Sequence, residues 1–174
     1  MRNKKSVLRI TYTAIFTAII VLATAFVKFS TGLGEGYIHF GDSIIYLTAC
    51  ILPLPYCLIA GALGGALADI LAGFAVWSVP TAIIKIVNVL PFALACRNNK
   101  SDKILNKKTA LIPVASGIIT ILGYFVAECF LYSVASATLS LIGNSTQAVA
   151  SGILFYIIAT ALDKINFKRR INNG

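Results

Sequence analysis

Three ionisable side chains, Asp69, Lys85 and Glu128, lie within long apolar stretches of the sequence. A charge in such surroundings is costly unless it is paired or faces water. Asp69 and Lys85 can form an ion pair, which would either fasten two helices together or line a polar pocket. Glu128 has Tyr124 and Tyr132 four residues to either side, so the three side chains share one helical face. An acid between two aromatic rings suits a cationic or hydrogen-bonding aromatic ligand, although a hydrogen bond between helices is the simpler alternative.

A second polar group lies in the segment GYIHFGDSIIYL, residues 36–47, which carries the single histidine of the chain. We expect His39 and Asp42 to order the loop that enters a helix here, with Asp42 and Ser43 capping that helix. Trp77 fits either a pocket wall or an anchor at the membrane interface. Besides the residues already named, the candidate binding residues are Tyr37, Asn88, Asn144 and Gln147.

The chain lacks the residue clusters of an enzyme, a metal site or a nucleotide site. The four cysteines stand singly and fit small buried apolar residues. The segment GALGGAL, residues 61–67, is rich in glycine but has neither the lysine nor the Ser/Thr of a phosphate-binding loop. With one histidine and no Ser/His or Cys/His arrangement, we expect no catalytic function and no cofactor.

Membrane helices must position these residues. Of the 174 residues, 58% are hydrophobic and 12% are charged, whereas roughly a quarter of a soluble domain is charged. A spanning helix needs ~20 apolar residues. We therefore predict an all-α integral membrane protein, a single domain over 1–174 with a bundle of six transmembrane helices. The predicted helices cover about 8–27, 43–52, 57–74, 79–96, 110–135 and 147–165. The second is short and either extends outward through His39 or is partly re-entrant.

Basic residues indicate how these helices are oriented. Thirteen of the fifteen Lys and Arg fall in three clusters, at the N terminus (1–7 and Arg9), in the segment 97–108 and around the C-terminal tail (166–174). An even number of predicted helices separates each pair of clusters, so all three and both termini are expected in the cytoplasm. The charge therefore reflects topology, and we expect no nucleic-acid partner. A cleaved signal peptide is the alternative, but the first apolar run is long for one.

Glycine and alanine point to a lid and to close helix contacts. Polar residues at the outer ends of the helices lie beneath a loop that contains Gly32, Gly34, Gly36 and Gly41. This pattern predicts a pocket open to the outside with a mobile loop above it. The stripe Gly61, Gly64, Gly65, Ala68 and Ala72 is expected to pack within the monomer. Ala14 and Ala18 form a smaller stripe that suits either such packing or a partner protein.

Three motifs, taken together, resemble the substrate-binding (S) components of energy-coupling factor vitamin transporters, of the riboflavin, pyridoxine and hydroxymethylpyrimidine branch. They are Gly36/Ile38/His39/Gly41/Asp42, then Gly65/Asp69/Gly73/Phe74, then Pro80/Thr81/Lys85. The resemblance implies a six-helix protein of the prokaryotic plasma membrane that binds its substrate near the outer surface. It also implies a transmembrane coupling protein, docked at Ala14 and Ala18, and two ATPase subunits that alone use ATP.

The ligand predicted from these residues is a small water-soluble vitamin or precursor, with pyridoxine or hydroxymethylpyrimidine favoured. Riboflavin and a queuosine-type base are alternatives in the same role. Thiamin is disfavoured, because the aromatic-rich pocket pattern of the thiamin branch does not align here. An autonomous proton-coupled carrier, with Glu128 or Asp69 as the proton site, is an alternative of another class.

Overall fold

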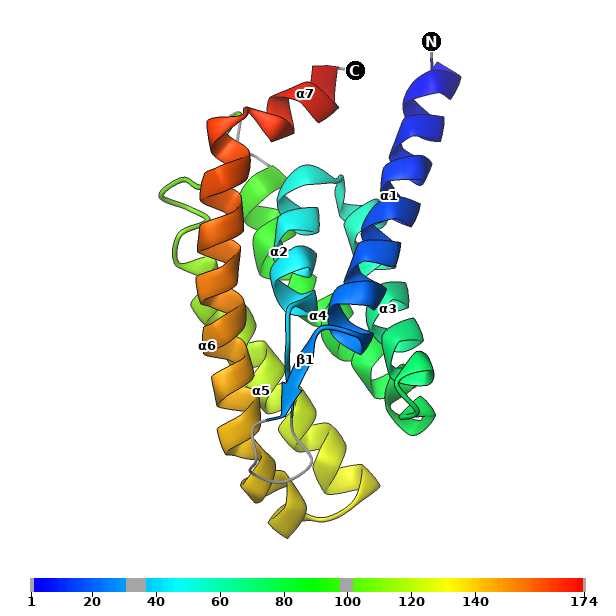
Figure 1. Ribbon diagram of the computed structural model, residues 1–174, viewed down its shortest axis with the longest axis vertical. Helices are drawn as coiled ribbons and strands as arrows, with labels where there is room; N and C mark the ends of the chain where they lie inside the picture. The colour runs from blue at the N-terminus through cyan, green and yellow to red at the C-terminus, as the bar shows by residue number, and fades with distance from the viewer. Residues whose placement is uncertain (1, 31–36, 98–101, 174) are drawn as a thin grey trace.

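The computed structural model describes residues 2–30, 37–97 and 102–173, which form a helical bundle with one short hairpin (Figure 1). The elements are α1 (Arg2–Ala25), β1 (Lys28–Ser30), β2 (Tyr37–His39), α2 (Gly41–Ile51), α3 (Leu54–Leu71), η1 (Ala75–Trp77), α4 (Ser78–Arg97), α5 (Ile112–Leu131), α6 (Val134–Lys164) and α7 (Phe167–Asn173). Strands β1 and β2 pair antiparallel, with Lys28 opposite His39.

Five helices in the described part of the chain are long and apolar enough to cross a membrane. They are Lys4–Ala25, Leu54–Leu71, Ala75–Cys96, Ile112–Leu131 and Val134–Lys164. Large apolar side chains are exposed along them, including Leu63, Leu122 and Leu139, as expected for surfaces that face lipid. The second predicted helix corresponds to α2, which has only 11 residues. The count of six spanning helices therefore stays a prediction.

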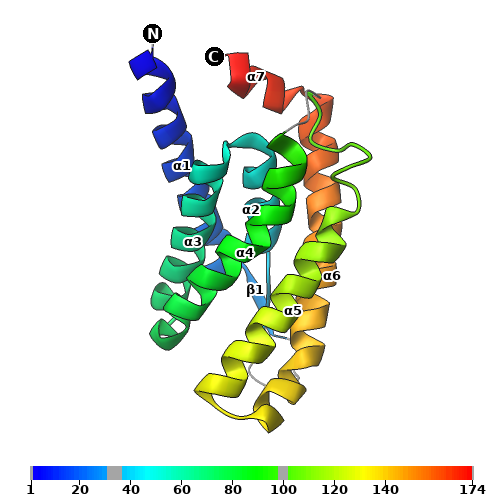
Figure 2. The ribbon, with the colours of Figure 1, turned by 180° about the vertical axis from the view of Figure 1, so that it is seen from behind.

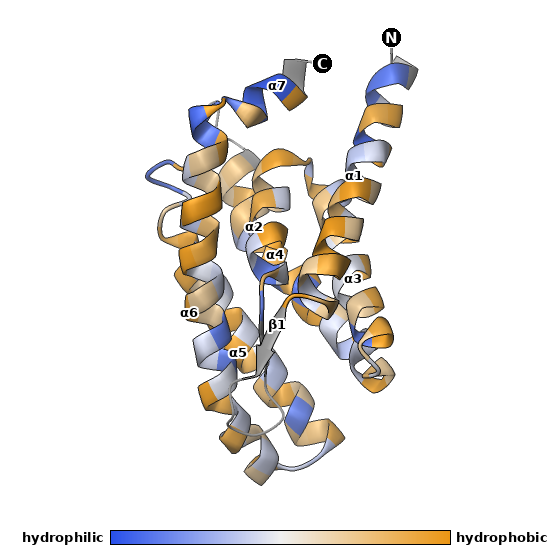
Figure 3. Cartoon of the chain, viewed as in Figure 1, coloured by the Kyte–Doolittle hydropathy of each residue, from blue (hydrophilic) through white to orange (hydrophobic). Residues whose placement is uncertain are grey.

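Both termini lie at one end of the bundle, which we call the terminal end (Figures 1 and 2). Helix α1 leads away from this end, and the hairpin returns the chain to α2. Helices α3 and α4 then form one antiparallel pair, and α5 and α6 form another. Figure 3 shows hydrophilic residues gathered at the terminal end, on α7 and on the first turns of α1.

Helix α2 forms the centre of the bundle because it is apolar on nearly every side. Ile45, Tyr46 and Leu47 are at most 2% exposed. The Tyr46 ring stacks on Phe92 of α4, with the centroids 4.7 Å apart, and meets Phe155 of α6 edge-on at 6.1 Å. A short helix buried on all sides is consistent with a core element that longer helices surround.

Glycines let α3 approach its neighbours closely. A Cβ added at Gly64 would lie 2.6 Å from Cγ2 of Ile20 on α1, and one at Gly61 would lie 3.0 Å from Cγ2 of Val89 on α4. The prediction that this stripe packs within the monomer is confirmed. Ala14 and Ala18 of α1 are instead exposed.

Two predicted boundaries are wrong. The predicted outer loop at about 136–146 belongs to α6, which begins at Val134. Its hydroxyl side chains are tolerated because they donate to carbonyls one turn earlier, as Thr138 does to Val134 O and Thr146 does to Ile142 O, both at 2.8 Å. Helix α5 correspondingly ends at Leu131 rather than near residue 135.

The start of α2 also differs from the prediction. Residue Phe40 is the N-cap and makes no side-chain capping bond, so Asp42 and Ser43 do not cap the helix. The Ser43 hydroxyl donates to Ser151 O on α6 at 3.0 Å. Gly41 begins α2 where a Cβ would collide with the Thr24 hydroxyl. The other loop glycines, Gly32, Gly34 and Gly36, lie outside the described residues.

Candidate ligand-binding site

A cavity of about 410 Å³ lies between the two helix pairs, near their ends furthest from the terminal end. Its volume falls within the range of small-molecule sites. We call it the aromatic cavity, and its lining residues are Thr24, His39, Gly65, Asp69, Phe74, Trp77, Thr81, Lys85, Tyr124, Glu128, Tyr132, Ser136, Leu139, Ser140, Asn144 and Gln147.

The structure brings nine of the twelve predicted binding residues together around this cavity. They are His39, Asp69, Trp77, Lys85, Tyr124, Glu128, Tyr132, Asn144 and Gln147. Asp42 and Asn88 do not line it, and the side chain of Tyr37 lies outside the described part of the chain. The roles of the nine in ligand binding stay predictions.

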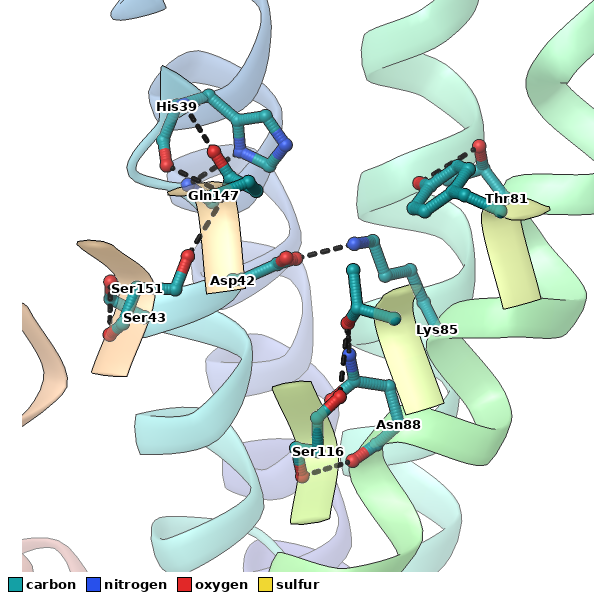
Figure 4. Close-up of polar contacts among 12 residues, drawn as sticks. His39, Asp42, Ser43, Thr81, Lys85, Asn88, Ser116, Gln147 and Ser151 are labelled. Atoms are coloured by element: carbon teal, nitrogen blue, oxygen red, sulfur yellow. Dashed lines mark hydrogen bonds and ion pairs between the residues drawn. The ribbon is translucent and has the colours of Figure 1, made fainter. Parts of the chain in front are cut away.

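Lys85, which lines the cavity, forms an ion pair with Asp42, which lies outside the lining (Figure 4). The Lys85 ammonium lies 2.5 Å from the Asp42 carboxylate, and their side chains are 2% and 1% exposed. The predicted pairing of Lys85 with Asp69 is therefore wrong, because the buried helix α2 places Asp42 in front of Lys85. A pair so deeply buried needs both members, since either charge left alone would be strongly destabilising.

Lys85 also contacts an aromatic ring of the cavity lining. The Lys85 ammonium lies 5.3 Å from the centre of the Tyr124 ring, within the range of a cation–π interaction. The hydroxyls of Tyr124 and Thr81 are 3.3 Å apart and hydrogen-bonded. Tyr124 is thus held in place by residues of α4 before any ligand arrives.

The hairpin closes one side of the cavity through His39 and Gln147. The backbone N–H of His39 donates to Gln147 Oε1 at 2.8 Å, and Gln147 Nε2 donates to His39 O at 3.0 Å and to the Ser151 hydroxyl at 2.9 Å. Nδ1 of His39 accepts from the Gly41 N–H at 3.1 Å. These bonds tie the entry of α2 to α6 across 108 residues of sequence.

Burial also keeps the His39 ring neutral. Desolvation lowers the pKa of His39 to about 4, and the opposing attraction of Asp42 is the smaller effect. Because Nδ1 accepts a hydrogen bond, the neutral ring carries its proton on Nε2. The ring therefore presents a neutral side chain to the cavity at physiological pH.

Aromatic rings form the opposite wall. Trp77 Nε1 donates to the Tyr132 hydroxyl at 3.3 Å. The Trp77 ring centre lies 5.8 Å from that of Tyr124 and 5.9 Å from that of Tyr132. These rings leave flat apolar surface beside polar groups, an arrangement suited to stacking a planar ligand.

Three buried polar atoms of the lining residues make no hydrogen bond with any described residue. They are Oδ2 of Asp69, Oε2 of Glu128 and Nδ2 of Asn144. Buried polar atoms of native proteins are nearly always paired. Two acceptors and one donor of the lining residues are therefore without a hydrogen-bond partner among the described residues.

Asn88 has a structural position beside the cavity rather than in its lining. It is fully buried, its Nδ2 donates to the Thr120 hydroxyl, and its backbone carbonyl accepts from the Ser116 hydroxyl at 3.0 Å (Figure 4). These bonds join α4 to α5. Asn88 therefore lies outside the cavity lining, and its predicted role in ligand binding stays a prediction.

Sequence reasoning missed part of the α6 wall. Ser136 and Ser140 line the cavity together with Asn144 and Gln147. The spacing of 4, 4 and 3 residues places all four on one helical face. The signal was present in the sequence but was hidden by reading 136–146 as a loop.

Known proteins resemble this chain over most of its length. Residues 4–164 match the family described as ECF-type riboflavin transporter, S component. A protein from Pyrococcus woesei, described as "Uncharacterized protein in gap 3'region", is 30% identical over 136 residues, which is 78% of this chain and 87% of the relative. The family match covers every helix that contributes to the aromatic cavity.

Proposed function

Because the chain belongs to the S-component family of ECF-type transporters, whose members are vitamin-binding membrane subunits, we propose that its aromatic cavity captures a flat, nitrogen-containing heteroaromatic vitamin. The two unpartnered carboxylate oxygens of Asp69 and Glu128 are the observation that carries this proposal. Both residues line a cavity whose lining also includes Trp77, Tyr124 and Tyr132. A ring that stacks on the aromatic wall and donates hydrogen bonds to both acids satisfies every one of these groups.

Pyridoxine and hydroxymethylpyrimidine fit best, because each is a small ring that carries several hydrogen-bond donors. Asp42 balances the charge of Lys85, so Asp69 and Glu128 are two acids in the lining that this lysine does not balance. An acidic lining favours a ligand with N–H and O–H groups over a ligand with negative charge. Riboflavin is the second candidate, since the family is described by that vitamin and its hydroxylated side chain also supplies donors.

The orientation follows from the charge distribution. The basic segments 2–9 and 164–170 both lie at the terminal end, which supports placing that end in the cytoplasm. The aromatic cavity then faces the outside of a prokaryotic plasma membrane. Helix α2, although short, completes six passes of the chain along the bundle.

Import then requires partners. A transmembrane coupling protein and two ATPase subunits supply the energy, and the exposed Ala14 and Ala18 of α1 offer the docking surface. The Ala14→Leu/Ala18→Leu variant should bind vitamin normally but lose co-purification with the coupling protein. Because these side chains are exposed, loss of vitamin binding in the same variant would contradict a purely docking role.

Native mass spectrometry of the purified protein tests the ligand assignment. The protein is incubated with pyridoxine, hydroxymethylpyrimidine, riboflavin, a queuosine-type base and thiamin, singly and in competition. We expect one molecule of pyridoxine or hydroxymethylpyrimidine per chain, displacing the others. If riboflavin outcompetes both, the vitamin is riboflavin and the proposed role in vitamin capture is unchanged. If none of the flat heteroaromatic compounds forms an adduct, the proposal is overturned.

Reconstituted uptake separates the proposal from a proton-coupled carrier. The buried acids Asp69 and Glu128 are also suited to carry a proton across a membrane. We expect no accumulation of vitamin by proteoliposomes that contain this chain alone. Accumulation that collapses on adding an uncoupler would favour the carrier.

A further inference from the structure

A second cavity of about 640 Å³ lies at the terminal end, between α1, the α2–α3 turn, the end of α4 and α7. We call it the basic cavity. Apolar side chains form much of its surface, namely Leu8, Ile51, Leu52, Leu54, Ala93 and Ile171. The vitamin proposal does not use this cavity, and the two lining sets share no residue.

Three cations line the basic cavity. Lys5 and Arg9 are four residues apart on α1, with Tyr12 three residues further along the same face. Lys168 enters from α7. No aspartate or glutamate belongs to the described lining. The cavity is therefore an apolar groove with a strongly positive rim.

Lys168 is the group that needs a partner. It is 7% exposed, and its ammonium makes no hydrogen bond with any described residue. Asp163, on the preceding helix, is already engaged, because its two oxygens accept from the N–H groups of Ile104 at 2.6 Å and Leu105 at 2.9 Å. A buried ammonium left alone is costly, and an anion in the cavity would remove that cost.

We propose that the basic cavity binds the phosphate group of an anionic membrane phospholipid. Lys168 would hold the phosphate from within, while Lys5 and Arg9 hold it from the rim. The apolar residues Leu8 and Leu54 favour a lipid over a soluble phosphate, because they offer surface for the first part of an acyl chain. Basic pockets between membrane helices are a known way of holding anionic headgroups.

Native mass spectrometry with defined lipids tests this proposal. The protein is delipidated and then exposed to phosphatidylglycerol, to phosphatidylcholine or to inorganic phosphate. We expect one retained phosphatidylglycerol, and little retention of the other two. Lys168→Met should lower this retention roughly tenfold or more, because a buried charge-assisted bond is lost. The double variant Lys5→Met/Arg9→Gln, altered only at exposed residues, should lower it at least about fivefold.

Lys107→Met is the matched control, since Lys107 is an exposed lysine that does not line the cavity. It should retain the lipid as the wild type does. Thermal unfolding gives a second readout: phosphatidylglycerol should raise the Tm of the wild type but not that of Lys168→Met, while without lipid that variant should be at least as stable as the wild type. Equal retention of phosphatidylcholine, retention unchanged in both cavity variants, or stronger binding of inorganic phosphate would each overturn the proposal.

Discussion

The two cavities of this molecule have opposite chemistry. The aromatic cavity is lined by Asp69 and Glu128, whose free oxygens are acceptors, and its one lysine is already paired. The basic cavity has three cations and no acid among its described lining residues. One therefore suits a ligand rich in donors, and the other suits an anion. The cavity at the terminal end therefore has a basic lining, and the cavity at the other end has a mainly acidic lining.

Two buried lysines make the contrast concrete. Lys85 and Lys168 are 2% and 7% exposed, yet only Lys85 has a carboxylate partner among the described residues. Lys85 thus has its charge balanced within the packed interior by Asp42. Lys168 is buried without a hydrogen-bond partner among the described residues, as expected for a residue that binds an anionic ligand.

Replacing Lys85 should have the largest effect. Lys85→Met leaves Asp42 buried without a partner, which should cost about 3–5 kcal/mol of unfolding free energy. Lys168→Met should cost nothing in the same assay. Thermal and denaturant unfolding in detergent measure both, with Asp42→Asn/Lys85→Met as a control that recovers much of the loss. Equal stability of the two single variants would contradict the claim that only Lys85 stabilises the fold through an ion pair.

The next largest effect is expected on vitamin affinity. Asp69→Asn and Glu128→Gln each replace a carboxyl oxygen acceptor by an amide nitrogen, and each should raise the Kd about tenfold or more. Unfolding should change less than in Lys85→Met, because one oxygen of each carboxyl group has no hydrogen bond among the described residues. Titration of the ligand that native mass spectrometry identifies measures the change. Wild-type affinity in the double variant would show that neither acid binds the vitamin.

A smaller effect is expected from pH, through His39 of the aromatic cavity. Its pKa falls from 6.5 to about 4 on folding, so the unfolded chain binds a proton that the folded chain excludes. Stability is therefore complete above pH 6.5 and falls as the pH drops towards 4. Between pH 7.5 and 5.5 the loss should be about 1 kcal/mol. His39→Gln should flatten this dependence, and an identical slope in that variant would assign it to other groups.

The smallest expected effect is that of a substitution in one cavity on ligand binding in the other. Lys168→Met should leave the vitamin Kd within about twofold of the wild-type value, because the two lining sets share no residue and each well-separated change acts independently. Glu128→Gln should likewise leave retention of phosphatidylglycerol unchanged. A tenfold change in either direction would show that the cavities are coupled.

Much of the candidate site follows from elementary rules. Charged residues inside apolar segments need a purpose, and the spacing of Tyr124, Glu128 and Tyr132 places them on one face, which is how the structure has them. The partner of Lys85 does not follow from such rules. Asp42 reaches it only because the short α2 is buried in the middle of the bundle, and no local pattern reports tertiary position.

The basic cavity could not be predicted for a similar reason. Lys5, Arg9 and Lys168 read as parts of basic cytoplasmic segments, which topology alone explains. Their convergence depends on α7 folding back towards α1, which Figure 2 shows and the charge pattern does not reveal. The polar segment 136–146 resembles a loop because Ser, Thr and Asn favour loops on average. Thr138 and Thr146 donate to carbonyls one turn earlier, which lets the segment remain helical inside α6.

Native mass spectrometry of one sample that contains both the vitamin and phosphatidylglycerol tests the central claim most directly. We expect a species that carries one molecule of each. We also expect that Asp69→Asn/Glu128→Gln loses only the vitamin and that Lys168→Met loses only the lipid. Adducts that exclude one another, or a vitamin adduct that depends on Lys168 and not on the two acids, would contradict it.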